Sequence, residues 1–215
     1  MSSSERERLV EGARRMGVPL GEPDAERLLR LLDELARWNR THNLTAITKR
    51  EDMITHHLLD SLSIHGDLRG RRIADVGTGA GFPGLPLAVV SPDKHFTLID
   101  SNAKKVRFVG HAARTLGLSN VEPVHGRAES IRPDQPFDTV VARAFAPLPV
   151  LLERVASLCG PHTRVLAMKG RRPEGEIASM PAGWRLTELR DLEVPGLGEA
   201  RCLLTLEREM PESPA

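Results

Sequence analysis

The stretch DVGTGAGFPGLP, residues 75–86, decides the fold of this chain. It holds four glycines and two prolines, and short apolar runs flank it on both sides. Because glycine has no Cβ, a turn of this composition lets the backbone approach a ligand closely. The pattern predicts a ligand-binding turn between a buried strand and a helix, and it leaves open whether the ligand carries a phosphate.

From residue 71 onward, short apolar runs alternate with helical patterns. Five runs predict buried strands, at residues 71–77, 95–100, 121–126, 138–144 and 164–170. Helical segments separate them, at residues 83–90, 103–117 and 146–160. Such alternation predicts a parallel sheet with crossover helices. Two final runs, at 184–194 and 200–209, predict an antiparallel pair at the sheet edge and bring the total to seven strands.

The residues before this sheet have a helical pattern. Segments 4–17, 22–40 and 50–66 are the expected helices. In the second one an apolar stripe recurs at helical spacing, formed by Leu28, Leu31, Leu32, Leu35 and Trp38. We expect a helical extension at 1–66 packed on the core, an α/β domain at 67–209 and a disordered tail at 210–215.

Composition narrows the class of protein. The formal net charge is +1 and aromatic residues make up 3% of the 215 residues, so neither a globally basic surface nor a platform of several stacking aromatics is expected. Cys159 and Cys202 lack metal-ligand spacing and indicate a reducing compartment. No signal peptide or membrane-spanning run is present. The sequence thus predicts a cytoplasmic protein without a metal site.

The glycine spacing separates two kinds of ligand. Gly77, Gly79 and Gly81 give G-x-G-x-G, whereas the dinucleotide fingerprint is G-x-G-x-x-G/A. The sixth place holds Phe82, and Pro83 follows it. Proline removes an N–H group that a pyrophosphate would use. The loop therefore disfavours a phosphate ligand.

An acidic residue follows at the spacing that a ribose site requires. Asp100 lies 19 residues after Gly81, at the end of the strand 95–100, where a carboxylate can accept both ribose hydroxyls. Two charge-assisted bonds contribute about 1.5–3 kcal/mol each. Seven strands, the glycine spacing and this acid favour S-adenosylmethionine, with its methionine end against the turn and Asp75. A nicotinamide-dependent dehydrogenase and a non-catalytic nucleotide-binding module stay open as alternatives.

Motifs along nearly the whole chain carry a family resemblance. In order they are WNRTHNLTAIT (38–48), HHLLDSL (56–62), DVGTGAGFPGLPLA (75–88), LIDSNAKKVRF (98–108), GRAE (126–129), ARAFAPL (142–148) and MKG (168–170). This set resembles the ribosomal RNA small-subunit methyltransferase G family, also called the glucose-inhibited division protein B family. The match runs from about Ala25 to the last strand and is far more specific than a glycine loop.

The resemblance implies a fold, a cofactor and a substrate. The fold is a class I S-adenosylmethionine-dependent methyltransferase, with a Rossmann-like seven-stranded sheet, its last strand antiparallel, and an N-terminal helical extension. The implied reaction transfers a methyl group to N7 of guanosine 527 in the 530 loop of 16S ribosomal RNA. With Asp75, Gly79 and Gly81 from the loop itself, the expected cofactor-binding residues are Gly77, Phe82, Asp100, Ser101, Asn102, Ala128, Glu129 and Arg143. Ala142 departs from the family pattern, because many relatives carry Ser there.

The chemistry of such a reaction needs no general base. Guanine N7 has a free lone pair, so the expected mechanism is in-line displacement on the sulfonium methyl, driven by alignment that can contribute about 7–11 kcal/mol. No catalytic residue is assigned with certainty, and Arg143 and Asn43 are the candidates for positioning. The segment 142–148 lacks the Asn/Asp-Pro-Pro-aromatic motif of exocyclic-amine methylation, and Cys159 lacks the context of a nucleophile.

Contacts to RNA are expected at two places. Lys169, Arg171 and Arg172 form a compact positive patch after the fifth strand, suited to the RNA backbone. Asn39 and Thr45 either line the substrate side of the pocket or form a structural corner between helices. The expected partner is 16S ribosomal RNA or the small subunit, with no membrane, no protein partner and a monomeric state. A methyltransferase of the same fold for a small molecule or a protein remains the rival, because the net charge is near zero.

His57 and Asp60 share one helix face in the segment 50–66. We expect a hydrogen bond between them, with Ser61 nearby, as structural support. His56 and His57 are adjacent and point to different faces, so they do not form the i, i+4 pair of a zinc site.

Overall fold

The computed structural model describes residues 3–209, and the expected tail at 210–215 lies outside them. A seven-stranded sheet has the order β3-β2-β1-β4-β5-β7-β6. The strands are β1 (Arg72–Val76), β2 (His95–Asp100), β3 (Val121–His125), β4 (Phe137–Arg143), β5 (Cys159–Lys169), β6 (Trp184–Asp191) and β7 (Cys202–Arg208). Strands β1 to β5 pair in parallel, and β7 runs antiparallel to both β5 and β6. The predicted seven strands and antiparallel last strand are confirmed.

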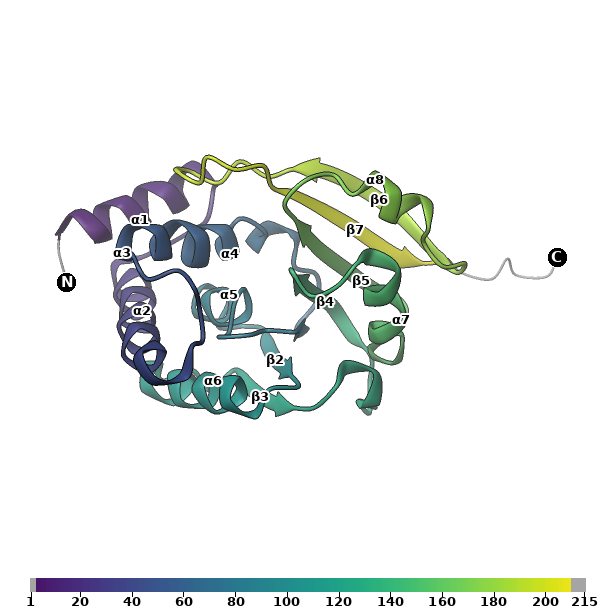
Figure 1. The fold of residues 1–215 in the computed structure, drawn as a ribbon, viewed down its shortest axis with the longest axis horizontal. Coiled ribbons are helices and arrows are strands. Elements are labelled where there is room, and N and C mark those ends of the chain that lie inside the picture. Colours follow the sequence, from purple (N-terminus) through teal and green to yellow (C-terminus); the bar gives the residue numbers. More distant parts are fainter. Residues whose placement is uncertain (1–2, 210–215) are drawn as a thin grey trace.

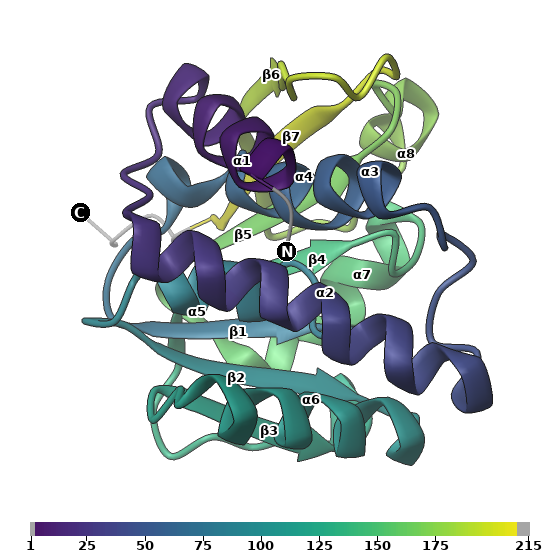
Figure 2. The same cartoon turned by 90° about the vertical axis from the view of Figure 1, so that its left-hand side faces the viewer.

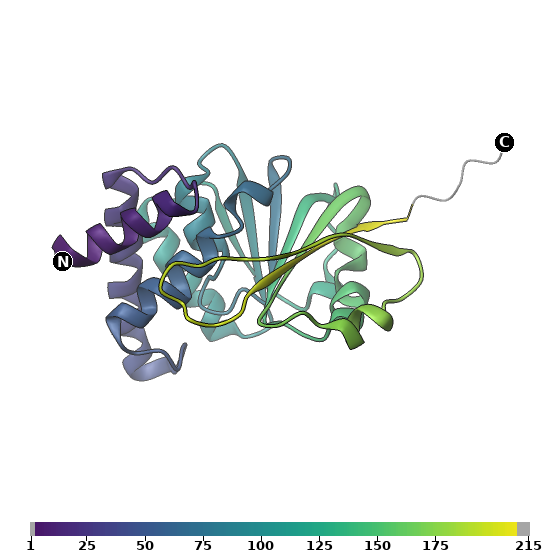
Figure 3. The same ribbon diagram turned by 90° about the horizontal axis from the view of Figure 1, so that it is seen from above.

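Helices cover both faces of this sheet (Figures 1 and 3). One layer holds α1 (Ser3–Arg15), α2 (Glu22–His42), α3 (Arg50–Met53), the π-helical turn η1 (Ile54–Leu59), α4 (Asp60–Leu62), α5 (Gly84–Val90) and α6 (Ala103–Leu116). The other holds α7 (Leu148–Val155) and α8 (Glu174–Ala178). Short 3₁₀ turns complete the chain: η2 (His65–Asp67), η3 (Ala128–Ser130) and η4 (Ala156–Leu158). None of the helices between residues 3 and 209 has the length and hydropathy of a membrane-spanning segment.

Strand order places the site. The chain leaves β1 toward β2 and β3 on one side and continues through β4 and β5 on the other. Figure 2 shows β1 and β2 running in the same direction. In an open parallel sheet the point of reversal, here between β1 and β4, leaves a crevice outside the carboxyl ends of the strands. The loops after these strands therefore converge at one edge.

One hydrophobic core joins the helical layer to the sheet. The predicted stripe of α2 is confirmed, with Leu28, Leu31, Leu32 and Leu35 fully buried and Trp38 partly buried. The same apolar cluster includes Leu58 from η1 and Ile73 and Phe96 from the sheet. The residues before β1 are thus held to the sheet by shared apolar burial, the dominant favourable term in folding.

Two predicted elements differ in the structure. The helix expected to run to residue 160 ends earlier, and β5 begins at Cys159 because Phe137 of β4 pairs with it. The Thr163 hydroxyl fixes this start, accepting from the Gly160 N–H at 2.8 Å and donating to the Phe137 carbonyl at 2.6 Å. The helix expected at 50–66 contains the π-helical turn η1 instead of running as a regular α-helix.

Candidate active site

The glycine turn after β1 has a backbone that only glycine adopts without strain. Gly77, Gly79 and Gly81 have φ values of 70°, 61° and 88°, in the left-handed region that L side chains rarely enter. A Cβ on Gly77 would also lie 2.2 Å from Cδ2 of Phe145, and one on Gly81 would lie 2.3 Å from Cδ1 of Leu85. Close packing therefore adds to the backbone requirement at two of the three positions.

Asp100 at the end of β2 is tied to this turn. Its Oδ2 accepts from the Gly79 N–H at 2.9 Å, and its Oδ1 accepts from the Asn102 N–H at 2.8 Å. Each carboxylate oxygen has lone pairs left after one such bond. The predicted acid is thus fixed beside the predicted glycine turn, with acceptor capacity remaining.

Asp75 lies at the end of β1 and is buried. Its Oδ2 accepts from the Thr78 hydroxyl at 2.6 Å and from the Gly84 N–H at 2.8 Å. Its Oδ1 is buried with no hydrogen-bond partner. Burial raises the pKa of this carboxyl to about 6, against the two hydrogen bonds and the nearby Arg143, which lower it. A positive charge placed beside this oxygen would favour the charged form of the carboxyl.

A cavity of about 390 Å³, here called cavity 1, opens at this edge. It is lined by Val76, Gly77, Ile99, Asp100, Ser101, Lys105, Gly126, Arg127, Ala128, Glu129, Ala144, Phe145 and Arg154. Five of the predicted cofactor-binding residues belong to this lining: Gly77, Asp100, Ser101, Ala128 and Glu129. The other six lie outside it: Asp75, Gly79, Gly81, Phe82, Asn102 and Arg143. Gly79 and Asn102 instead hold Asp100 in place.

A second cavity of about 380 Å³, here called cavity 2, lies between the helical layer and β4 and β5. Its lining is Ile47, His56, His57, Asp60, Arg143, Ala144, Met168, Lys169, Gly170 and Arg201. Ala144, which has a φ of 49°, belongs to both linings. The two cavities therefore adjoin at the segment that follows β4.

Phe82 is a buried wall behind cavity 2 and is 4% exposed. The His57 ring stacks on it at 4.7 Å between centroids and 18° between planes, and Cζ of Arg143 lies 5.8 Å from its centroid. Burial lowers the pKa of His57 to about 3, helped by the charge of Arg143, so this imidazole is neutral. The expected bond from His57 to Asp60 is wrong, because His57 Nε2 pairs with the Thr45 hydroxyl at 3.0 Å.

Asp60 joins three parts of the chain. Its carboxylate accepts from Nη1 of Arg143 at 2.9 Å and from Nε of Arg201 at 3.2 Å. Arg143 also donates to the carbonyl of His56 at 2.8 Å. The Asp60 network (Asp60, Arg143, Arg201 and the His56 carbonyl) therefore fixes both walls of cavity 2. Sequence reasoning missed Asp60 in this role and missed Arg201 altogether, although the motif HHLLDSL contains the aspartate.

The predicted RNA patch is partly neutralised within the chain. Lys169 donates to Glu176 and to the Ala146 carbonyl, both at 2.8 Å. Arg172 forms two bonds to Asp191, at 3.0 and 2.9 Å. Arg171 is exposed and has no partner among the described residues. The contact of this patch with RNA stays a prediction.

Asn39 and Thr45 hold a corner after α2. The Asn39 amide donates to the Thr45 carbonyl and accepts from the Thr45 N–H, both at 2.9 Å. Asn43 ends the helix in the left-handed conformation, with φ 48°, and is exposed. These contacts describe a structural corner, and Thr45 additionally reaches cavity 2 through His57. The substrate role of Asn39 and Thr45 and the positioning role of Asn43 stay predictions.

Two other kinds of chemistry find no support at the described residues. Burial raises the pKa of the Cys159 thiol to about 12, which leaves it protonated and a poor nucleophile. Among residues 3–209 no group of three His, Cys, Asp or Glu side chains is arranged to hold a metal ion.

Comparison with known proteins identifies a family for this chain. A model of the family described as rRNA small subunit methyltransferase G matches residues 24–205. The ribosomal RNA small subunit methyltransferase G of Methylococcus capsulatus is 47% identical over 199 residues, covering 93% of this chain and 97% of the relative. That of Nitrosococcus oceani is 46% identical over 198 residues, covering 92% of each.

A solved structure agrees at the level of the fold. The crystal structure of a SAM-dependent methyltransferase from Aquifex aeolicus superposes with a TM-score of 0.54 at 20% identity, covering 70% of this chain and 90% of that one. The chain therefore belongs to the rRNA small subunit methyltransferase G family and is an S-adenosylmethionine-dependent methyltransferase.

Proposed function

We propose that this enzyme methylates N7 of guanosine 527 in the 530 loop of 16S ribosomal RNA. The observation that carries the proposal is the pair of adjoining cavities, which meet at Ala144. Cavity 1 has the glycine turn and Asp100, and cavity 2 has space for an acceptor base. The names of the relatives support a ribosomal RNA substrate, and the motif resemblance supports the position.

The residues around cavity 1 fit S-adenosylmethionine. Asp100 has lone pairs left to accept hydrogen bonds from the ribose hydroxyls. The buried Oδ1 of Asp75 has no hydrogen-bond partner within the protein. The close packing of Phe145 against Gly77 leaves the turn no room for a Cβ. When bound, the cofactor supplies an electrophilic methyl group on a sulfonium. Asp75, Gly77, Gly79, Gly81, Phe82, Asp100, Ser101, Asn102, Ala128, Glu129 and Arg143 are the residues proposed to hold it.

The proposed mechanism depends on positioning. Guanine N7 attacks with its own lone pair, so no side chain has to remove a proton. Arg143 is held by Asp60 and by the His56 carbonyl, which fixes it between Phe82 and cavity 2. The neutral His57, which lines cavity 2 and stacks on the buried Phe82, would form one wall for the incoming base. Alignment of this kind can lower a barrier by about 7–11 kcal/mol at best.

The proposed substrate implies a cellular location for the enzyme. Ribosomal RNA and the small subunit reside in the bacterial cytoplasm, and we propose the same location for this protein. We propose that it acts as a monomer without a protein partner.

The test is incorporation of labelled methyl groups. Tritiated S-adenosylmethionine is incubated with the enzyme and either unmethylated small-subunit RNA or small subunits, and the RNA is digested to nucleosides. We expect label in 7-methylguanosine from one site, and an Asp100→Ala variant should lose it through weak cofactor binding. No label in RNA with either substrate would overturn the proposal, and label in a small molecule or protein would support the rival acceptor.

A further inference from the structure

Three basic residues around cavity 1 have no acidic partner. Lys105 of α6, Arg127 after β3 and Arg154 of α7 all line the cavity. Among residues 3–209 none of them lies within ion-pair distance of a carboxylate, and Cζ of Arg154 lies 5.5 Å from the centroid of the Phe145 ring. We call Lys105, Arg127 and Arg154 the rim cations.

Cavity 2 shows the opposite arrangement. Each of its basic side chains is paired with a carboxylate: Arg143 and Arg201 with Asp60, and Lys169 with Glu176. The positive charges of these side chains are neutralised by ion pairs within the protein. Of the two cavities, cavity 1 is therefore the one whose lysine and arginine side chains are free to meet an external anion.

The cofactor does not account for the rim cations. Cavity 1 has two carboxylates in its lining, Asp100 and Glu129, against the three rim cations. S-adenosylmethionine brings a sulfonium, an ammonium and one carboxylate, so the filled cavity gains a further positive charge. Exposed charges separated by less than the Debye length, about 8 Å at physiological ionic strength, are screened less than more distant ones. An excess of positive charge around the filled cavity favours the binding of a polyanion at its mouth.

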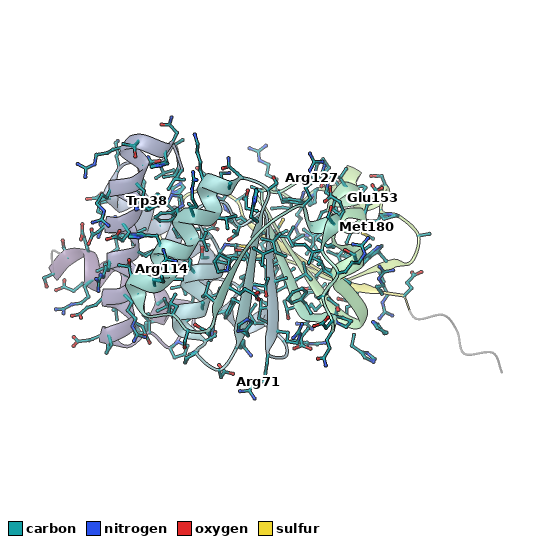
Figure 4. The ribbon with its side chains drawn as sticks, turned by 90° about the horizontal axis from the view of Figure 1, so that it is seen from below. Trp38, Arg71, Arg114, Arg127, Glu153 and Met180 are labelled. Carbon is teal, nitrogen blue, oxygen red and sulfur yellow. The ribbon has the colours of Figure 1, made fainter. Side chains whose placement is uncertain are left out.

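The rim cations are also accessible to a ligand that approaches from solvent. Figure 4 shows Arg127 at the end of the strands opposite to Arg71, and Glu153, the neighbour of Arg154, lies toward the same end as Arg127. Arg127 and Arg154 are exposed and Lys105 is half-buried. Lys104 and Arg107 of α6 are also exposed, and their side chains have no partner among the described residues.

We propose that the RNA backbone crosses the mouth of cavity 1 and that its phosphates bind the rim cations, so that bound RNA covers the cofactor. The inference rests on the proposed RNA substrate and adds a docking surface separate from Lys169, Arg171 and Arg172. Two ligands that meet in this way are coupled. By thermodynamic linkage RNA raises the affinity for the cofactor as much as the cofactor raises the affinity for RNA.

The first experiment measures RNA binding. The triple variant Lys105→Ala, Arg127→Ala, Arg154→Ala is titrated with unmethylated small-subunit RNA over a series of salt concentrations. Because each contact to single-stranded phosphate contributes about 0.7 to the salt slope, we expect the slope to fall by about 2 and the affinity to fall at least about tenfold. The affinity for S-adenosylmethionine without RNA should hold or rise, because positive charges are removed from around a cationic ligand.

A matched control removes the same number of cations elsewhere. The side chains of Arg30 and Arg114 are exposed and unpaired among the described residues, and the Arg71 side chain bonds only the Asp93 carbonyl. The variant Arg30→Ala, Arg71→Ala, Arg114→Ala changes the net charge equally but leaves the rim cations in place. It should bind RNA within about twofold of the wild type. Equal losses in both triple variants would overturn the proposal, since net charge alone would then explain the effect.

The second experiment measures coupling. Dissociation of labelled S-adenosylmethionine is followed with and without saturating RNA, and we expect RNA to slow it by about five- to 150-fold in the wild type. The rim variant should lose this slowing at RNA concentrations that still saturate it. Equal cofactor release with and without RNA in a wild type that methylates RNA would overturn this inference and leave the proposed function standing. If the wild type neither binds nor methylates RNA, both this inference and the proposed function are overturned.

Discussion

Replacing Asp60 should loosen the tie between the helical layer and the sheet. Its side chain is 3% exposed and accepts from Arg143 and Arg201, whose side chains are 20% and 19% exposed. Asp60→Ala leaves both guanidinium groups without their carboxylate. Breaking a buried ion pair by removing one partner costs about 3–5 kcal/mol. Since both arginines keep some contact with water, we expect a loss of about 3 kcal/mol in the free energy of unfolding.

The measurement is urea unfolding followed by circular dichroism, together with the melting temperature. For a chain of this size 1 kcal/mol corresponds to roughly 2–4 °C, so Asp60→Ala should melt about 6–12 °C lower than the wild type. Asp60→Asn keeps the volume and one acceptor oxygen, and its loss should be smaller. Cofactor affinity should change less than the rate with RNA, because Asp60 lines cavity 2 and not cavity 1.

A nearby carboxylate supplies the control. Asp67 pairs with Arg190 at 2.6 Å, but these side chains are 12% and 38% exposed, and Asp67 belongs to neither cavity lining. A pair with one partner this exposed is worth about 0–1 kcal/mol. If Asp67→Ala destabilises the protein as much as Asp60→Ala does, the reasoning about the Asp60 network is refuted.

Three further predictions concern titration and the glycine turn. The His57 pKa of about 3 lies below the unfolded value of 6.5, so the unfolded chain binds the extra proton and stability falls as the pH drops from 6.5 toward 3. His57→Phe should reduce this fall in the free energy of unfolding between pH 6.5 and pH 3, measured by urea unfolding. An unchanged pH dependence would contradict the low pKa of His57. The Asp75 pKa of about 6 in the fold exceeds the unfolded value of 3.8, so the fold binds this proton more tightly than the unfolded chain does. The resulting stabilisation of the ligand-free fold is fully present below pH 3.8 and is lost as the pH rises through 6. Cofactor affinity should instead fall as the pH drops from 7.5 to 5, and calorimetry on Asp75→Asn should show no such dependence. Gly77→Ala should lose cofactor binding at least about tenfold more than Gly79→Ala, because only the first Cβ meets Phe145, at 2.2 Å, while the nearest atom to the second is 4.0 Å away; equal losses in calorimetry would point to backbone strain alone.

Local sequence determined the glycine turn and the acid beside it. Positive φ at Gly77, Gly79 and Gly81 is a property of single residues, and the position of Asp100 follows from its place at the end of a buried strand. Alternation of apolar runs and helical stripes likewise predicted the parallel strands and the antiparallel last strand. These features depend on backbone preference and on periodicity, both of which a chain carries residue by residue.

Partner choice was decided by the tertiary structure. Asp60 meets Arg143 across 83 positions and Arg201 across 141, and no spacing rule connects residues so far apart. Lys169 and Arg172 look like free cations in the sequence, but the fold gives them Glu176 and Asp191. A long charged side chain has several acidic groups within reach, and only the assembled layers determine which one it meets. The sequence by itself therefore determined where the glycine turn lies, whereas the fold decided which basic side chains remain without an acidic partner.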